Sequence, residues 1–165
     1  MSEAPVVDQW IWTDADFERM GWHDAQIHAL AWCQESGELL LDLDYILEWA
    51  GPCDPDEAFR FLTVPATLVF DFVTELRIDL RPWPSFDVLD LHRSAEPVEH
   101  GRLGSSQERT WRWTIACHEG EIVLHSPRFT QYIRRAPVLN TTQSLSLGER
   151  GGLSFARERQ DAPAA

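Results

Sequence analysis

The strongest constraint on the fold is the segment from Leu39 to Trp49, in which apolar and polar side chains alternate. Its odd-numbered positions are apolar or aromatic, whereas Asp42, Asp44 and Glu48 stand at even-numbered positions. Successive side chains of a β-strand point to opposite faces of the sheet, so this pattern is typical of a strand with one face in the core. The segment therefore predicts a long, half-buried strand.

A tight turn at Ser36-Gly37 would join this strand to the residues before it, because glycine tolerates the positive φ of two-residue hairpin turns. The whole segment 22–49 then forms one hairpin, in which Glu35 pairs with Glu38. The further pairs in this register are Trp32 with Leu41, Leu30 with Leu43, His28 with Tyr45 and Asp24 with Trp49. A slip of one residue would instead place His28 opposite Asp44, and the register stays open at this point.

The rest of the chain repeats short extended segments separated by turns. Aromatic, β-branched or alternating residues predict strands at 59–64, 67–72, 76–80, 86–92, 110–117, 122–125 and 153–155. The polar segment 139–147 also favours extended structure, and acidic residues after Thr13 predict one short helix before Gly21. The expected fold is mostly β: an antiparallel curved sheet or a two-sheet sandwich of hairpins, with one short N-terminal helix.

A chain of 165 residues is long enough for one domain with a real core. The expected organisation is a flexible leader at 1–9, a single β-rich domain at 10–156 and a disordered tail at 157–165, since chain ends without apolar patterning order poorly. Eight tryptophans are scattered along the domain, which is typical of core packing and leaves open a small-ligand pocket lined by their rings.

Acidic residues dominate the charge. The chain has 27 acidic and 14 basic residues, for a net charge of −13. Nucleic acids and anionic membranes repel such a surface, so neither is an expected partner, whereas a basic protein would be attracted. The densest acidic group, at the hairpin and the loop after it, is either a solvated surface or a docking surface for such a partner. Its members are Asp42, Asp44, Glu48, Asp54, Asp56 and Glu57.

The cysteine pattern and the N-terminus indicate the compartment. Three cysteines without a C-x-x-C motif argue against a disulfide framework or a cysteine zinc site. The N-terminal residues lack the basic and apolar regions of a signal peptide, and no apolar run approaches the ~20 residues of a membrane span. We therefore expect a reduced, cytoplasmic protein.

Histidines and carboxylates on the hairpin are the candidates for metal chemistry. His23, Asp24 and His28, with Asp44 across the hairpin, are ligand types that zinc and non-haem iron bind. His23 and His28 are separated by five positions, so a regular strand points them to opposite faces unless a bulge intervenes. The chain has no G-x-S-x-G and no G-x-G-x-x-G motif. We expect no catalytic residues and no cofactor, although enzymatic activity stays open.

Four motifs together resemble those of a known family. They are Trp22-His23-Asp24 followed by Ile27-His28, then Leu41–Ile46, Pro65–Phe70 and Phe129–Arg134. They look like a family of small bacterial proteins, most of them uncharacterised, some of which are encoded as immunity proteins beside polymorphic toxins. The resemblance spans roughly residues 20–138. It supports the expected fold more than any activity, and it brings no catalytic residue set to this chain.

These observations favour one function and leave an alternative. The favoured function is a cytoplasmic protein-binding module of the immunity type, which neutralises a basic toxin through an acidic surface. The alternative is a metal-binding protein or metal-dependent enzyme that uses the His/Asp cluster at His23, Asp24 and His28. The oligomeric state does not follow from the sequence.

Overall fold

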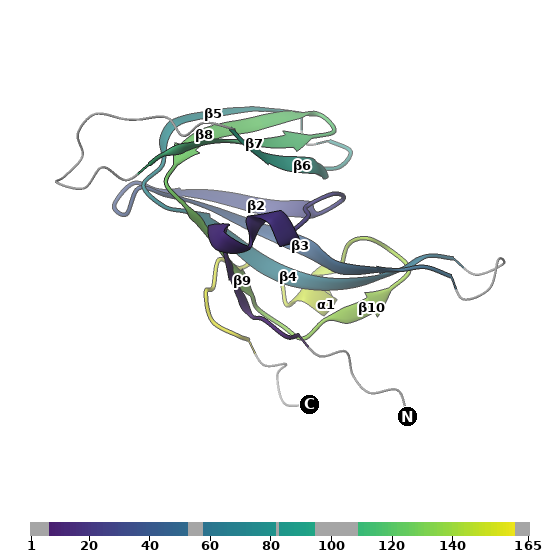
Figure 1. Ribbon diagram of the computed structural model, residues 1–165. Helices are drawn as coiled ribbons and strands as arrows, with labels where there is room; N and C mark the ends of the chain where they lie inside the picture. Colours follow the sequence, from purple (N-terminus) through teal and green to yellow (C-terminus); the bar gives the residue numbers. More distant parts are fainter. Residues whose placement is uncertain (1–6, 53–57, 82, 95–108, 161–165) are drawn as a thin grey trace.

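Two antiparallel β-sheets stack face to face in the computed structural model, which describes residues 7–52, 58–81, 83–94 and 109–160 (Figure 1). Sheet A has the strand order β1-β9-β4-β3-β2, and β10 also pairs with β4. Its strands are β1 (Ile11–Thr13), β9 (Phe129–Ile133), β4 (Arg60–Phe70), β3 (Glu38–Ala50), β2 (Gln26–Cys33) and β10 (Val138–Asn140). The predicted mostly β fold, as a two-sheet antiparallel sandwich, is confirmed.

Sheet B has the strand order β5-β8-β7-β6. Its strands are β5 (Thr74–Leu80), β8 (Gly120–Ser126), β7 (Trp111–Cys117) and β6 (Val88–Arg93). The two sheets also meet along one side, where Gln26 of sheet A forms a bridge with Asp87, the residue before β6. The first residues of β2 and β6 therefore lie next to each other, although 61 positions separate the bridged pair in sequence (87 minus 26).

The predicted N-terminal helix is present as a 3-10 helix, η1 (Asp14–Arg19), which follows the cap residue Thr13. A second short helix, α1 (Leu147–Arg150), was not predicted. Ser146 caps it by accepting a hydrogen bond from the Glu149 backbone, and Gly151 ends it in the left-handed conformation, so local capping overrides the β-favouring composition. Residues 153–155, predicted as an edge strand, are not in a strand.

The register of the β2–β3 hairpin differs from the predicted one. Cys33 pairs with Glu38, and Trp32 pairs with Leu39 instead of Leu41. The turn thus spans residues 34–37 rather than Ser36-Gly37 alone. Because this shift is an even number of residues, each side chain near the turn keeps its predicted face. A longer turn is compatible with the alternation, because alternation determines which face each side chain occupies but not the length of the turn.

A bulge at His28 changes the register farther along β2. Ile27 pairs with Leu43 and Ala29 pairs with Asp42, so His28 has no partner in the ladder. An extra residue in one strand shifts the later side chains by one position. The bulge keeps Ile27 in the core and moves His28 to the outer face of sheet A, the face turned away from sheet B. The predicted pairing of His28 with Tyr45 is therefore wrong.

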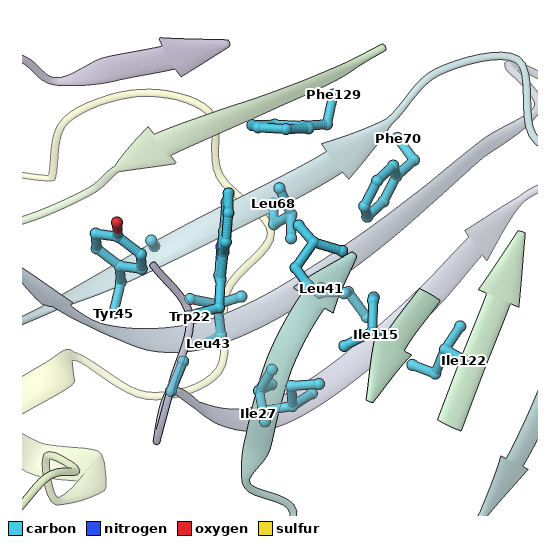
Figure 2. Close-up of a cluster of buried hydrophobic side chains, with 14 of the residues drawn as sticks. Trp22, Ile27, Leu41, Leu43, Tyr45, Leu68, Phe70, Ile115, Ile122 and Phe129 are labelled. Carbon is cyan, nitrogen blue, oxygen red and sulfur yellow. The ribbon is translucent and has the colours of Figure 1, made fainter. Parts of the chain in front are cut away.

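Apolar and aromatic side chains from both sheets fill the space between them (Figure 2). Trp113 of β7 is fully buried, and its ring packs edge-on against Phe129 with centroids 5.4 Å apart. Trp22 packs against Phe129 as well, at 5.6 Å, and its Nε1 donates a hydrogen bond to Gln131 Oε1. These two rings have the predicted packing role. Their burial is tolerated because each polar N–H donates a hydrogen bond to an acceptor.

Residues at both ends of the described chain pack on the domain. Val7 belongs to the core cluster, Arg157 forms an ion pair with Glu38, and the Gln160 N–H donates to the Arg134 carbonyl. The domain therefore extends beyond the predicted limits of 10–156. Residues 1–6 and 161–165 lie outside the described part. No helix in the described ranges is long and apolar enough to cross a membrane.

Replacing Leu41 by alanine tests the position of the core. Leu41 is fully buried between the sheets, so Leu41→Ala should lower the free energy of unfolding by about 2–5 kcal/mol. The matched change Leu147→Ala affects a side chain that is 60% exposed and should change that free energy by less than about 0.5 kcal/mol. Urea denaturation followed by tryptophan fluorescence measures both, and equal losses would contradict this core.

Candidate functional site

The acidic residues predicted as a docking surface separate into different environments. Asp42 and Asp44 point to the outer face of sheet A, as predicted, but both are fully buried and cannot contact a partner. Their assignment as partner-binding residues is therefore wrong. Glu48 is exposed on β3. Asp54, Asp56 and Glu57 lie outside the described residues.

Two arginines explain how Asp42 and Asp44 are buried. Arg150 donates from both terminal nitrogens to Asp42, at 2.6 and 2.9 Å, and from Nε to Asp44 at 3.1 Å. Arg134 donates to Asp42 at 2.6 Å and to the Thr67 hydroxyl at 2.8 Å. A buried charge is costly unless it is paired and hydrogen-bonded. We call these four side chains, Asp42, Asp44, Arg134 and Arg150, the buried ion network.

The buried ion network attaches the C-terminal segment to sheet A, and α1 lies on the side of this sheet away from sheet B (Figure 1). Backbone N–H groups of Leu145 and Ser154 donate to Asp44 and Asp42, and Arg150 also donates to the Gly152 carbonyl. The Thr67 hydroxyl donates to the Ala156 carbonyl. Residues 145–156 are therefore held by side chains of the central strands β3 and β4.

The balance between burial and hydrogen bonding sets the pKa of Asp42. Burial alone would raise the pKa of this carboxyl, but hydrogen bonds from Arg150, Arg134 and the Ser154 backbone more than offset it, so the pKa is lowered. Burial also works against the charged form of Arg150, whose pKa is nevertheless raised because it faces both aspartates. The network therefore contains charged groups that stabilise one another.

The two histidines of the predicted metal site lie in different places. His28 Nε2 lies 2.8 Å from Asp44 Oδ2, at the edge of the buried ion network. His23 is exposed, stacks on Trp49 and lies 3.6 Å from Asp24 Oδ2. The bulge does bring His28 to Asp44, but not to His23. In the described ranges, no group of three or more His, Cys, Asp or Glu side chains could hold a metal ion.

Asp24 instead belongs to an open cleft of about 550 Å³ at the end of the sandwich where β2 and β6 begin. Backbone and side-chain atoms from four parts of the chain form it. The residues that line this cleft are Asp24, Gln26, Phe61, Ser85, Asp87, Thr141, Thr142, Gln143 and Ser144. Hydroxyl, amide and carboxylate groups predominate, and Phe61 adds an aromatic surface.

Local backbone contacts place the two carboxylates of the cleft. Asp24 adopts a φ of 61°, in the left-handed region that aspartate tolerates better than most residues. Its N–H donates to the Val88 carbonyl, and the Val88 N–H donates to the Ala25 carbonyl, at 2.8 Å each. These bonds join the turn before β2 to the start of β6. Asp24 and Asp87 therefore come from segments that are hydrogen-bonded to each other.

The third part of the cleft is the loop at 141–144, which follows β10. Gln143 Nε2 donates to Asp24 Oδ2 at 2.6 Å. The next residue, Leu145, is fixed by its hydrogen bond to Asp44. The buried ion network thus holds one end of a loop whose side chains form part of the cleft. The sequence contains no motif for this loop, because its partners Asp24 and Asp44 precede it by 119 and 101 residues.

Aromatic rings border the cleft. Trp49 packs edge-on against Phe61, which lines the cleft, with centroids 5.2 Å apart. The other contact of Trp49 is a stack with His23 at 6.0 Å and an interplanar angle of 19°. Trp49 is still 46% exposed. No tryptophan is among the described residues that line this cleft. The exposed ring of Trp49 lies beside it, in contact with Phe61, and the lining itself is largely polar.

Comparison with known proteins adds no assignment: no protein-family model, no curated protein and no solved structure matches this chain. The geometry of the cleft and of the buried ion network therefore carries the argument. Sequence reasoning singled out Asp24 but missed Gln26, Asp87 and Gln143. Nothing in their local sequence marks these three residues, since only the packing of the two sheets brings them together.

The buried ion network predicts a large difference between two arginine substitutions. Arg150→Met leaves two buried carboxylates without their shared partner, so it should lower the free energy of unfolding by about 3–5 kcal/mol. Arg157→Met breaks the partly exposed pair with Glu38 and should cost less than about 1 kcal/mol. Urea denaturation of both variants measures the difference, and a similar small loss in each would argue against a structural role for the network.

The lowered pKa of Asp42 predicts a loss of stability in acid. A carboxyl with a depressed folded-state pKa stabilises the protein above its unfolded value, about 3.9, and this contribution disappears as the pH falls through the folded value. The wild-type unfolding free energy should therefore decrease below about pH 4. Asp42→Asn should be less stable at neutral pH and show a shallower decrease, as measured by urea denaturation across pH. Identical slopes would contradict the assignment.

Proposed function

We propose that the protein is a non-catalytic binding module of the immunity type, which binds a basic toxin at the cleft beside Asp24 and Asp87. The main support is the charge of this cleft. Two carboxylates line it, and none of the described residues that form it is basic. Outside the lining, His23 lies 3.6 Å from Asp24, and no described arginine pairs with either carboxylate. A partner that brings positive charge into the cleft would therefore offset negative charge there.

The net charge of −13 supports the same choice of partner. A strongly acidic protein attracts basic partners over distances of about a Debye length, roughly 8–10 Å at physiological ionic strength, which speeds their association. Exposed Glu48, next in the chain to Trp49, adds a negative charge in the same region of β3. The docking surface proposed here is centred on Asp24 and Asp87, in place of the buried pair Asp42 and Asp44.

The buried ion network supports binding by keeping the cleft preformed. Asn140 of β10 pairs with Phe61 just before the loop at 141–144, and at its other end Gln143 binds Asp24 and Leu145 binds Asp44. A surface that is already ordered loses little conformational entropy on binding. This division of roles accounts for two kinds of aspartate: buried ones that hold the structure together and partly exposed ones that are available to a partner.

The four motifs that resemble the immunity-type family support a toxin as the partner. A toxin that is produced in the same cell must be blocked where it would act, so this proposal places the protein in the cytoplasm. It needs no metal, cofactor or reacting group in the cleft. Tight binding and coverage of the toxin's functional surface would be sufficient.

Co-expression with the product of the adjacent gene tests this function. Wild-type protein should protect cells from that product and form a stable complex with it. The double variant Asp24→Asn/Asp87→Asn should weaken the complex by about tenfold or more, because charge-assisted hydrogen bonds contribute about 1.5–3 kcal/mol each. Calorimetry on purified proteins measures the affinity.

Glu35→Gln is the matched control, since it removes one negative charge from the exposed β2–β3 turn at the other end of β2. It should leave the affinity within about twofold of the wild type. A partner that binds all three proteins equally would place the interface elsewhere. Absence of both protection and binding would refute the proposed function.

A further inference from the structure

We infer that the cleft is a binding site for a guanidinium group, and that an arginine side chain of the partner enters it between Asp24 and Asp87. That the arginine belongs to a toxin rests on the proposed function, but the preference for a guanidinium group depends only on the residues of the cleft. The cleft can therefore be tested without any partner protein. Three features carry the inference: the free hydrogen-bond acceptors, their spread around the cleft and the exposed tryptophan beside it.

The free acceptors are the first feature. Asp24 Oδ2 accepts one hydrogen bond, from Gln143. Across the described part of the chain, no side chain or backbone N–H donates to Asp24 Oδ1 or to the carboxylate of Asp87. Asp87 is nevertheless half-buried. A half-buried carboxylate that lacks a donor gains from a cationic donor that binds it directly.

The spread of the acceptors is the second feature. Asp24 belongs to the turn before β2 and Asp87 precedes β6. The polar residues Gln26, Ser85 and Ser144 line the same volume of about 550 Å³. A guanidinium group is planar and carries five N–H donors, so it can bind carboxylates on more than one side. An ammonium group has three donors around one compact, strongly hydrated charge and would satisfy fewer of these acceptors.

The exposed ring of Trp49 is the third feature. It lies beside the cleft through its contact with Phe61, and the stack with His23 restricts its movement. Arginine binds the faces of tryptophan rings more often than lysine does, through cation–π and stacking interactions. Trp49 therefore supplies an exposed aromatic surface beside Phe61, which itself lines the cleft.

Other small ligands fit this cleft less well. A neutral sugar could use the hydroxyls and amides but would leave the negative charge of Asp24 and Asp87 uncompensated. A metal ion would need at least three suitable ligands, and no such group exists among the described residues. The chemistry of the lining therefore favours an organic cation with many donors.

Titration with agmatine, which carries the guanidinium of arginine on a short chain, tests the inference directly. Two-dimensional NMR of the full chain should show saturable shifts of the Asp24, Gln26, Asp87 and Gln143 backbone amides. Cadaverine, the matched lysine analogue, should bind at least about threefold more weakly because it forms fewer hydrogen bonds. Glucose should cause no saturable shifts.

Variants locate the site. Asp87→Asn should weaken agmatine binding by about three- to tenfold, since the carboxylate is partly open to solvent, and Asp87→Glu should restore part of the affinity. Trp49→Leu should weaken agmatine more than cadaverine. Glu35→Gln should bind like the wild type. Thermal unfolding and the NMR spectra themselves verify that each variant is folded.

Equal affinities for agmatine and cadaverine would overturn the guanidinium preference, and so would binding of glucose or shifts confined to other surfaces. The outcome is separable from that of the proposed function. If the adjacent gene product binds but agmatine does not, the inference fails and the binding function stands. If agmatine binds selectively while the co-expressed product is neither bound nor neutralised, the cleft inference stands and the toxin partner is rejected.

Discussion

The buried ion network of Asp42, Asp44, Arg134 and Arg150 is the interaction that holds the C-terminal segment on the outer face of sheet A. β-strand alternation points both aspartates away from the core, where two charges on central strands would normally meet water. Here the C-terminal segment covers them, and its Arg150 binds both carboxylates. Burial of these charges is tolerable only because each is paired and hydrogen-bonded. The network therefore attaches residues 145–156 to sheet A in one arrangement.

The same network connects the fold to the proposed function. Asp44 fixes Leu145, so the loop at 141–144 stays against Asp24 and forms one part of the cleft. The buried aspartates are paired with arginines inside the protein, whereas Asp24 has only His23 at 3.6 Å and no described basic residue lines the cleft. Under the proposed function, the acidic character of the chain serves two purposes: internal attachment at the buried pair and attraction of a cationic group at the cleft. A preformed acidic cleft suits an inhibitor that must bind quickly.

Sequence reasoning was most successful where the signal was local. The alternation correctly assigned the faces of β3 from Leu39 to Ile46, and the short strands correctly indicated an antiparallel sandwich. A register shift between Ile46 and Glu48 reverses the predicted faces of Glu48 and Trp49. It was less successful where the pairing of strands depended on the exact position of a single residue. The turn is longer than Ser36-Gly37, and the bulge at His28 reverses the face on which that histidine lies. Neither error changed the fold, because the turn shift was even and the bulge restored Ile27 to the core.

By itself, the sequence determined the fold class, the faces of the regular strand segments and the overall negative charge, since these follow from periodicity and composition. Only the tertiary structure decided which acids are available. Asp42 meets its arginines 92 and 108 residues later in the chain, and Asp24 meets Gln143 119 residues later. Alternation reports whether a side chain faces the core or points outward, but it carries no information on what later covers the outer face. Burial of that face by the C-terminal segment is why Asp42 and Asp44 are structural, whereas Asp24 and Asp87 stay partly exposed.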